Sequence, residues 1–162
     1  MVRRSCGLHR PNSKTESNGN WESKEVMKQE RTVTVSVGEG KYRLWATAVS
    51  TGGEGINVTL GGGEVPHLGA VAIAIPRPSL QDPSKVSATT SVYLLVGHKD
   101  DALAKPLADR MARALQQPVV VAAGVHLGAP GTYTAFPEEI KEVLRTNEIL
   151  AEELIRRLNN ES

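Results

Sequence analysis

Aromatic residues and cysteine are scarce in this chain of 162 residues, and each scarcity excludes a class of protein or site. Phe, Trp and Tyr make up 4% of the residues, so a core must be built from Val, Ile, Leu and Ala. The single cysteine, Cys6, cannot close an intramolecular disulfide, which excludes a disulfide framework and a cysteine-based zinc site. It also fits a reducing compartment, and we therefore expect a cytoplasmic protein.

Long apolar runs and an excess of one charge are also missing. No segment approaches the roughly 20 apolar residues that a membrane-spanning helix needs, and no apolar stretch of an export signal follows Arg3 and Arg4. Lysine and arginine total 19 against 18 acidic residues, which leaves a net charge of +1 with both signs interspersed. An extended electrostatic surface for nucleic acid is therefore not expected. We predict neither a membrane nor a nucleic-acid partner.

The chain divides into two unequal parts. Residues 1–28 are polar, with almost no aliphatic periodicity, and such a segment cannot bury enough surface to offset its ordering entropy. We predict a disordered tail there. Residues 29–162 show sustained patterning and have the length of one domain.

Alternating apolar residues dominate the first half of this domain. Val33, Val35 and Val37 share one face of an extended segment, which is typical of a half-buried strand. Similar patterns predict strands at residues 31–37, 41–50, 56–60, 69–75, 87–96 and 118–125. The last of these is almost continuously apolar, as in a strand covered on both faces. In the fourth, alternate positions are alanine and would permit close approach by a helix or another backbone.

Two helices are predicted in the second half. Apolar residues recur every fourth position at Leu103, Leu107, Met111 and Leu115, and Pro106 either begins this helix or follows a distorted turn. A second helix is predicted over residues 137–158, with an apolar side formed by Ile140, Leu144, Ala151, Leu154 and Leu158. Strands followed by helices indicate an α+β fold, with an antiparallel or mixed sheet of about six strands and two main helices packed on one face.

Three histidines stand at predicted strand ends. His67, His98 and His126 could together form a zinc site with an open position, although no short-range ligand spacing such as HExxH supports it. The alternatives are a hydrogen bond from each imidazole to a carbonyl, which is the commoner arrangement, or contacts with an anionic ligand or partner. The sequence alone favours the first of these and predicts no metal.

The loop after the fourth strand offers an anion site. Guanidinium, ammonium and hydroxyl groups all donate hydrogen bonds to phosphate oxygens. Such groups are supplied by Arg77, Ser79, Lys85, Ser87 and Thr89. A solvated loop would have the same composition, and both interpretations stay open.

A catalytic arrangement is not evident. Asp100 and Asp101 could act as an acid/base pair, but carboxylates before a helix are more often caps. No GxSxG nucleophile elbow occurs, and Cys6 lies in the predicted tail. We therefore expect a protein that binds or delivers something rather than an enzyme.

Several motifs resemble a known family. They are PHLGAVA, the loop RPSL…SATTS, GHKDD and the later GVH, in that order between residues 66 and 126. Over approximately residues 30–158 the chain is similar to the prenylated-flavin chaperones (LpdD-like), the small D subunits associated with UbiD-type hydroxyarylic acid decarboxylases. The resemblance implies a fold like that of the proteasome assembly chaperones, often paired as a dimer.

The resemblance also implies a function. The protein would assist the maturation of a UbiD-like decarboxylase or its loading with prenylated FMN, as a homodimer that holds the flavin transiently. From residue chemistry we assign the ligand contacts to His67, Arg77, Ser79, Lys85, Ser87, Thr89 and His98. The alternatives are a small metal-dependent enzyme using His67, His98 and His126, and an assembly chaperone that binds no small ligand.

Overall fold

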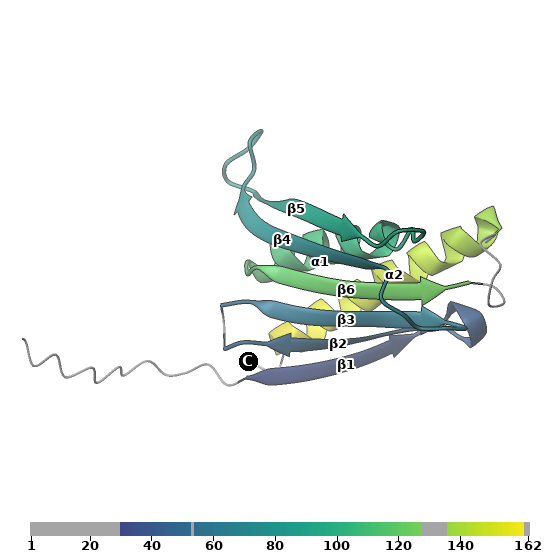
Figure 1. Ribbon diagram of the computed structural model, residues 1–162. Helices are drawn as coiled ribbons and strands as arrows, with labels where there is room; N and C mark the ends of the chain where they lie inside the picture. Colours follow the sequence, from purple (N-terminus) through teal and green to yellow (C-terminus); the bar gives the residue numbers. More distant parts are fainter. Residues whose placement is uncertain (1–29, 53, 128–135, 161–162) are drawn as a thin grey trace, which may run out of the picture.

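The computed structural model describes residues 30–52, 54–127 and 136–160, and the predicted tail lies outside them. Within these residues the chain forms a mixed sheet of six strands and two helices, as predicted (Figure 1). The strands are β1 Arg31–Val37, β2 Leu44–Ser50, β3 Ile56–Gly63, β4 Ala70–Pro78, β5 Val86–Leu94 and β6 Val119–His126. The helices are α1 Asp101–Leu115 and α2 Pro137–Asn160, and a 3-10 turn, η1, covers Gly40–Tyr42.

The order of strands across the sheet is β1-β2-β3-β6-β4-β5. Neighbouring strands run antiparallel except β3 and β6, which are parallel. β6 is the last strand among the described residues and inserts between β3 and β4, so it joins the three-stranded unit β1-β2-β3 to the hairpin β4-β5. This insertion places the end of β6 beside the start of β4.

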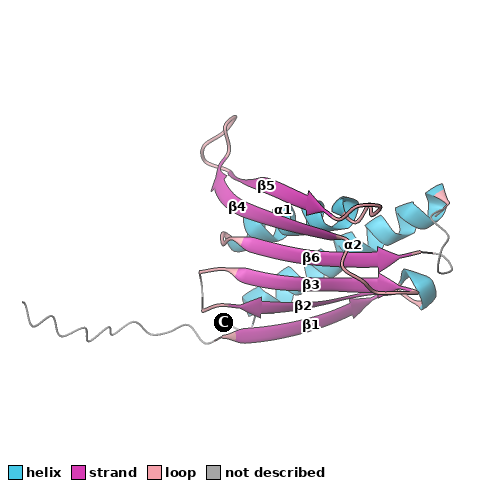
Figure 2. Cartoon of the chain, viewed as in Figure 1, coloured by secondary structure: helices cyan, strands magenta, loops and turns pink. Residues whose placement is uncertain are grey.

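Both helices lie on one face of the sheet, behind the strands in the view of Figure 2. α1 packs on β4, β5 and β6, and α2 packs on β1 and β2. The alternation of the strands explains the core, because every second residue points to the helices. Val33, Leu44, Val58, Ala72 and Val121 are among these buried residues.

The alanine face of β4 lies under α1. Ala70, Ala72 and Ala74 are fully buried, and α1 buries alanines of its own. Small side chains on both elements allow the helix to approach the strand closely, since a bulkier residue there would exceed native packing density. The predicted close approach to a helix is confirmed.

Two details of the helices differ from the sequence prediction. α1 begins at Asp101 and contains Pro106, so Pro106 does not begin the helix. The proline lacks an N–H, and the helix continues past it at the cost of one backbone hydrogen bond. In α2, Ile140 is 45% exposed, while the buried face follows Val143, Asn147, Leu150 and Leu154. The 3.6-residue period of the whole helix places Ile140 at the edge of that face.

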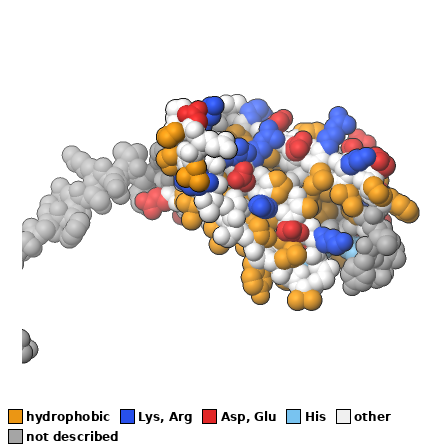
Figure 3. Space-filling view, turned by 90° about the horizontal axis from the view of Figure 1, so that it is seen from above, with side chains coloured by type: hydrophobic (Ala, Val, Ile, Leu, Met, Phe, Trp, Pro, Cys, Tyr) orange, Lys and Arg blue, Asp and Glu red, His pale blue; other side chains and the backbone are white. Residues whose placement is uncertain are grey.

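The second face of the sheet carries no helix within the described residues. Val120 and Ala122 of β6 are half-buried there, so the expectation that this strand is covered on both faces is wrong for the single chain. Ile73, Ile75 and Tyr93 are exposed on the same face. In Figure 3 most charged side chains gather on the helix side, and hydrophobic and uncharged surface lines much of the other side.

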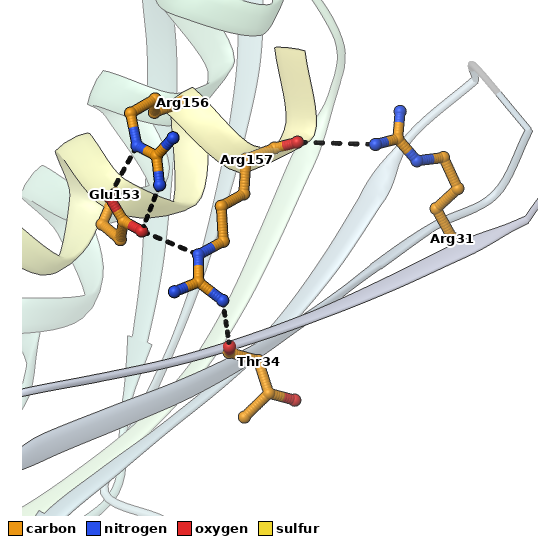
Figure 4. A network of polar contacts seen from close by, with 5 residues as sticks. All are labelled: Arg31, Thr34, Glu153, Arg156 and Arg157. Carbon is orange, nitrogen blue, oxygen red and sulfur yellow. Dashed lines mark hydrogen bonds and ion pairs between the residues drawn. The ribbon is translucent and has the colours of Figure 1, made fainter. Parts of the chain in front are cut away.

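Arginines connect the end of α2 to the edge strand β1 (Figure 4). Arg157 donates a 2.7 Å hydrogen bond to Glu153 and another, of 3.3 Å, to the carbonyl of Thr34. Arg156 also donates to Glu153, and Arg31 donates to the carbonyl of Leu158. These arginine hydrogen bonds lower the pKa of Glu153 to about 2.

None of the helices among the described residues is both long enough and apolar enough to cross a membrane.

Candidate functional site at one end of the sheet

Three connections meet at the end of the sheet where β4 begins. His67 comes from the segment before β4, His98 and Asp100 from the segment between β5 and α1, and His126 from the last position of β6. They meet because β4 runs antiparallel to both neighbours, so its start lies beside the ends of β5 and β6. We call His67, His98, Asp100 and His126 the histidine cluster.

Asp100 lies at the centre of the histidine cluster and is 5% exposed. Its Oδ1 accepts a 2.8 Å hydrogen bond from the backbone N–H of Val125, which ties α1 to β6. Its Oδ2 lies 3.3 Å from Nε2 of His67 and 3.6 Å from Nδ1 of His98. Although Asp100 precedes α1, its side chain makes no capping hydrogen bond. Capping was the expected role of this carboxylate, and that expectation is wrong.

The three imidazoles form one group. The rings of His67 and His98 have centroids 4.5 Å apart, and the ring of His126 meets that of His67 edge-on at 6.1 Å. His67, His98 and Asp100 each place one potential ligand atom within 4.8 Å of the others. Nε2 of His126 is buried and has no hydrogen-bond partner among the described residues. The strand-end histidines therefore do converge, although no spacing in the sequence indicated it.

Two glycines make room for this arrangement. A Cβ on Gly69 would stand 1.9 Å from Oδ2 of Asp100, and a Cβ on Gly124 would stand 1.8 Å from the carbonyl oxygen of His67. Both distances are far below contact, so neither position accepts a side chain without displacing the cluster. The glycines of PHLGAVA and GVH thus serve the same site.

Exposed apolar side chains lie on the segments that carry the histidines. Val65 and Leu68 flank His67 and are 42% and 50% exposed, while Leu94 and Val96 precede His98 and are 41% and 101% exposed. We call these four residues the apolar rim. Apolar surface left in water beside converging polar groups is typical of a ligand or partner site. The rim was not predicted from the sequence, because apolar residues at strand ends have the same pattern as core residues.

The predicted anion loop lies elsewhere, on the β4–β5 hairpin. Arg77 donates from Nε to Oγ1 of Thr89 at 2.9 Å, and from Nη1 to the carbonyl of Pro78. Arg77 and Lys85 line an open hollow of about 290 Å³ together with three prolines and Gln116. Ser87 pairs with Arg77 across the hairpin.

The charges of this hairpin are largely satisfied within it. Lys85 pairs with Asp82 at 3.0 Å. Oγ of Ser79 accepts hydrogen bonds from the N–H groups of Gln81 and Asp82. Hydrogen bonds from Ser84 and Lys85 lower the pKa of Asp82, so its negative charge persists beside the lysine. An incoming anion would have to displace or tolerate this carboxylate.

The predicted site residues thus form two separate groups. His67 and His98 lie at the start of β4, whereas Arg77, Ser79, Lys85, Ser87 and Thr89 lie at its far end. Extended strands rise about 3.3 Å per residue, so Ala70 and Arg77 are roughly 23 Å apart. A single small ligand on one chain does not reach both groups.

Comparison with known families identifies the chain. The family described as the prenylated flavin chaperone LpdD-like domain matches residues 38–159. That range contains η1, strands β2 to β6, α1, nearly all of α2 and the whole histidine cluster. No curated protein gives a significant match. The chain belongs to the prenylated flavin chaperone LpdD-like family.

Proposed function

We propose that this protein is a non-catalytic chaperone that holds prenylated FMN transiently and loads it into a UbiD-like aromatic acid decarboxylase. The family match over residues 38–159 carries the proposal. When bound in the decarboxylase, the cofactor supplies the chemistry of decarboxylation, and the chaperone supplies binding and protection. Both proteins would work in the cytoplasm, which the single cysteine of this chain fits.

The end of the sheet that carries the histidine cluster suits such a ligand better than the β4–β5 hairpin. A prenylated flavin combines a broad apolar ring system with carbonyl and phosphate oxygens. The apolar rim can cover ring surface, and Nε2 of His98, whose Nδ1 faces Asp100, can donate a hydrogen bond to an oxygen atom. No aromatic side chain belongs to the rim, so the ring system is not sandwiched, and this favours transient handling over storage.

We also propose that the protein forms a homodimer through the open face of its sheet. Among the described residues, the exposed side chains in the middle of that face belong to Thr, Ser, Asn, Val, Ile and Tyr, and none of them carries a charge. An isologous interface places each residue near its own copy, so an uncharged face avoids repulsion between like charges. Two sheets packed face to face also bury the apolar residues of β4 and β6.

Native mass spectrometry with prenylated FMN tests ligand binding and its location. We expect the wild-type chain to carry the flavin, and His98→Ala to lose most of it. Arg77→Ala decides whether the β4–β5 hairpin also takes part, since it removes the guanidinium and leaves the backbone pairing of β4 unchanged. Arg110→Ala is the matched control, because Arg110 is an exposed α1 residue paired with Glu152.

The outcomes separate the alternatives. Equal flavin binding by the wild type and His98→Ala would remove the histidine cluster from the ligand site. No flavin on the wild type under conditions that load the decarboxylase with prenylated FMN would contradict cofactor handling and leave an assembly chaperone. A loss confined to Arg77→Ala would move the site to the hairpin.

A metal-dependent enzyme is the second candidate, because the rings of His67, His98 and His126 lie close together, although the ligand atoms found within 4.8 Å of one another belong to His67, His98 and Asp100. It predicts turnover by the metal-loaded chain alone. The chaperone proposal predicts that hydroxybenzoic acids stay unchanged unless the decarboxylase is added. Liquid chromatography of the acid and its phenol product distinguishes the two.

A further inference from the structure

We propose that His67, His98 and Asp100 form a binding site for one divalent first-row transition metal ion. This site goes beyond the cofactor role proposed above and does not depend on it. It also departs from the expectation of no metal, which followed from the lack of a short-range ligand spacing in the sequence. The orientation, the spacing and the surroundings of the three side chains all support such a site.

The orientation of His67 presents a lone pair to a carboxylate. Its Nδ1 lies 3.1 Å from the carbonyl oxygen of Val65. A carbonyl only accepts hydrogen bonds, so Nδ1 carries the proton and the neutral ring has its lone pair on Nε2. In that tautomer the lone pair of Nε2 faces Oδ2 of Asp100 at a distance of 3.3 Å. A hydrogen bond from the far ring nitrogen to a backbone carbonyl is the usual arrangement of a metal-bound histidine.

The same carboxylate oxygen is shared with a second imidazole. Nδ1 of His98 lies 3.6 Å from Oδ2 of Asp100, and the two rings approach to 4.5 Å between centroids. Two ring nitrogens therefore face one carboxylate oxygen, and the three potential ligand atoms gather around a common point. A cation placed between them would receive a lone pair from each atom.

The distances are close to those of a coordination shell. Ligands bound at about 2.1 Å and separated by 90° to 110° lie roughly 3.0–3.4 Å apart. The contacts of Oδ2 with the two histidines, at 3.3 and 3.6 Å, are near this range, and all three atoms lie within 4.8 Å. Two imidazoles and one carboxylate are a donor set that suits Fe²⁺, Mn²⁺ and Zn²⁺. Ca²⁺ prefers oxygen ligands alone and does not suit a site with two nitrogen donors.

The surroundings support the site and leave it accessible. The hydrogen bond from Val125 to Oδ1 fixes the Asp100 carboxylate, and Gly69 leaves room for Oδ2. The side chains of His67 and His98 are 21% and 34% exposed, so a bound ion would keep positions open to water or a further ligand. Nε2 of His126 is buried and without a partner among the described residues, and its ring lies beside that of His67, with the ring centroids 6.1 Å apart.

Metal binding is tested on the full chain with the ion alone. The protein is dialysed against a chelator and then titrated with Zn²⁺ and Mn²⁺ in a calorimeter, and Co²⁺ is added separately to read its visible absorption. We expect one ion per chain for at least one of these metals, and a Co²⁺ spectrum with nitrogen ligands. His98→Ala should weaken binding more than the roughly 10–100-fold that loss of an outer-shell partner costs.

The control variant is His9→Ala, which removes the one histidine outside the cluster and should bind as the wild type does. Circular dichroism confirms that each variant is folded. Binding below half an ion per chain, or equal affinity of His98→Ala and wild type, would overturn the proposal and leave an ion pair between His67 and Asp100. A wild-type chain that binds the metal ion but not prenylated FMN would instead count against the proposed function only.

Discussion

Replacing Asp100 with alanine should destabilise the folded domain even in the absence of any ligand. The carboxylate is 5% exposed, and its Oδ1 accepts the N–H of Val125 at 2.8 Å. Removing the acceptor leaves a poorly solvated donor in β6, which costs about 1.5–3 kcal/mol. Loss of a negative charge at the start of α1 adds about 0.3–1 kcal/mol. The free energy of unfolding should therefore fall by roughly 2–4 kcal/mol.

Asp100→Asn separates the hydrogen bond from the charge. The asparagine side-chain oxygen can still accept from Val125, so only the contribution of the charge, about 0.3–1 kcal/mol, should be lost. For a domain of this size, 1 kcal/mol corresponds to about 4 °C in Tm. We therefore expect Tm to fall by roughly 8–16 °C for Asp100→Ala and by about 1–4 °C for Asp100→Asn.

The assay is chemical and thermal unfolding followed by circular dichroism, with a chelator present so that metal binding does not contribute to stability. Equal losses for the two variants would show that the charge, and not the hydrogen bond to Val125, stabilises the fold. A loss below about 1 kcal/mol for Asp100→Ala would refute the reasoning, since an orphaned buried donor costs more than that.

Three further predictions follow from other parts of the molecule. Gly69→Ala should lower the free energy of unfolding by about 1.5–3 kcal/mol, because its Cβ would displace the Asp100 carboxylate. In Gly55→Ala the Cβ meets only ordinary contacts, the nearest at 3.5 Å, so its free energy of unfolding in urea should stay within about 1 kcal/mol of the wild type. Glu153 has a pKa of about 2 instead of 4.5. The stabilising contribution of its charge is therefore complete above pH 4.5 and is lost as the pH falls toward 2. Glu153→Gln lacks this charge, so its Tm should decline less than that of the wild type between pH 4.5 and 2. An equal decline in both proteins would count against the arginine contacts. Ile73→Lys should convert the proposed dimer to a monomer by light scattering at unchanged secondary structure, while Ile149→Lys, at an exposed isoleucine of α2, should not. A wild-type monomer would contradict the dimer.

Local patterns were sufficient to predict most of the elements. Each of these patterns depends on one element alone: apolar residues alternate at Val33, Val35 and Val37 and recur every four positions at Leu103, Leu107 and Met111. The structure buries these residues or packs them against the core. The position of β6 between β3 and β4 depends on the whole sheet, and no local pattern encodes it. The likeness to proteasome assembly chaperones stays a prediction.

The candidate site was predicted only in part for the same reason. His67, His98 and His126 were noticed because they stand at strand ends, but their convergence follows from the order of the strands. Arg77 was grouped with His67 on residue chemistry alone, while the length of β4 separates them in space. Asp100 resembled a helix cap, and only the tertiary contact with Val125 shows its other role.

Transfer of the cofactor tests the central claim most directly. The chain is loaded with prenylated FMN, freed of excess ligand and mixed with the apo form of a UbiD-like decarboxylase, and the flavin on each protein is measured by native mass spectrometry. The account predicts that flavin moves from the chaperone to the decarboxylase and that decarboxylation of the aromatic acid begins. Flavin that stays on this chain, or a decarboxylase that loads equally fast from free cofactor, would contradict it.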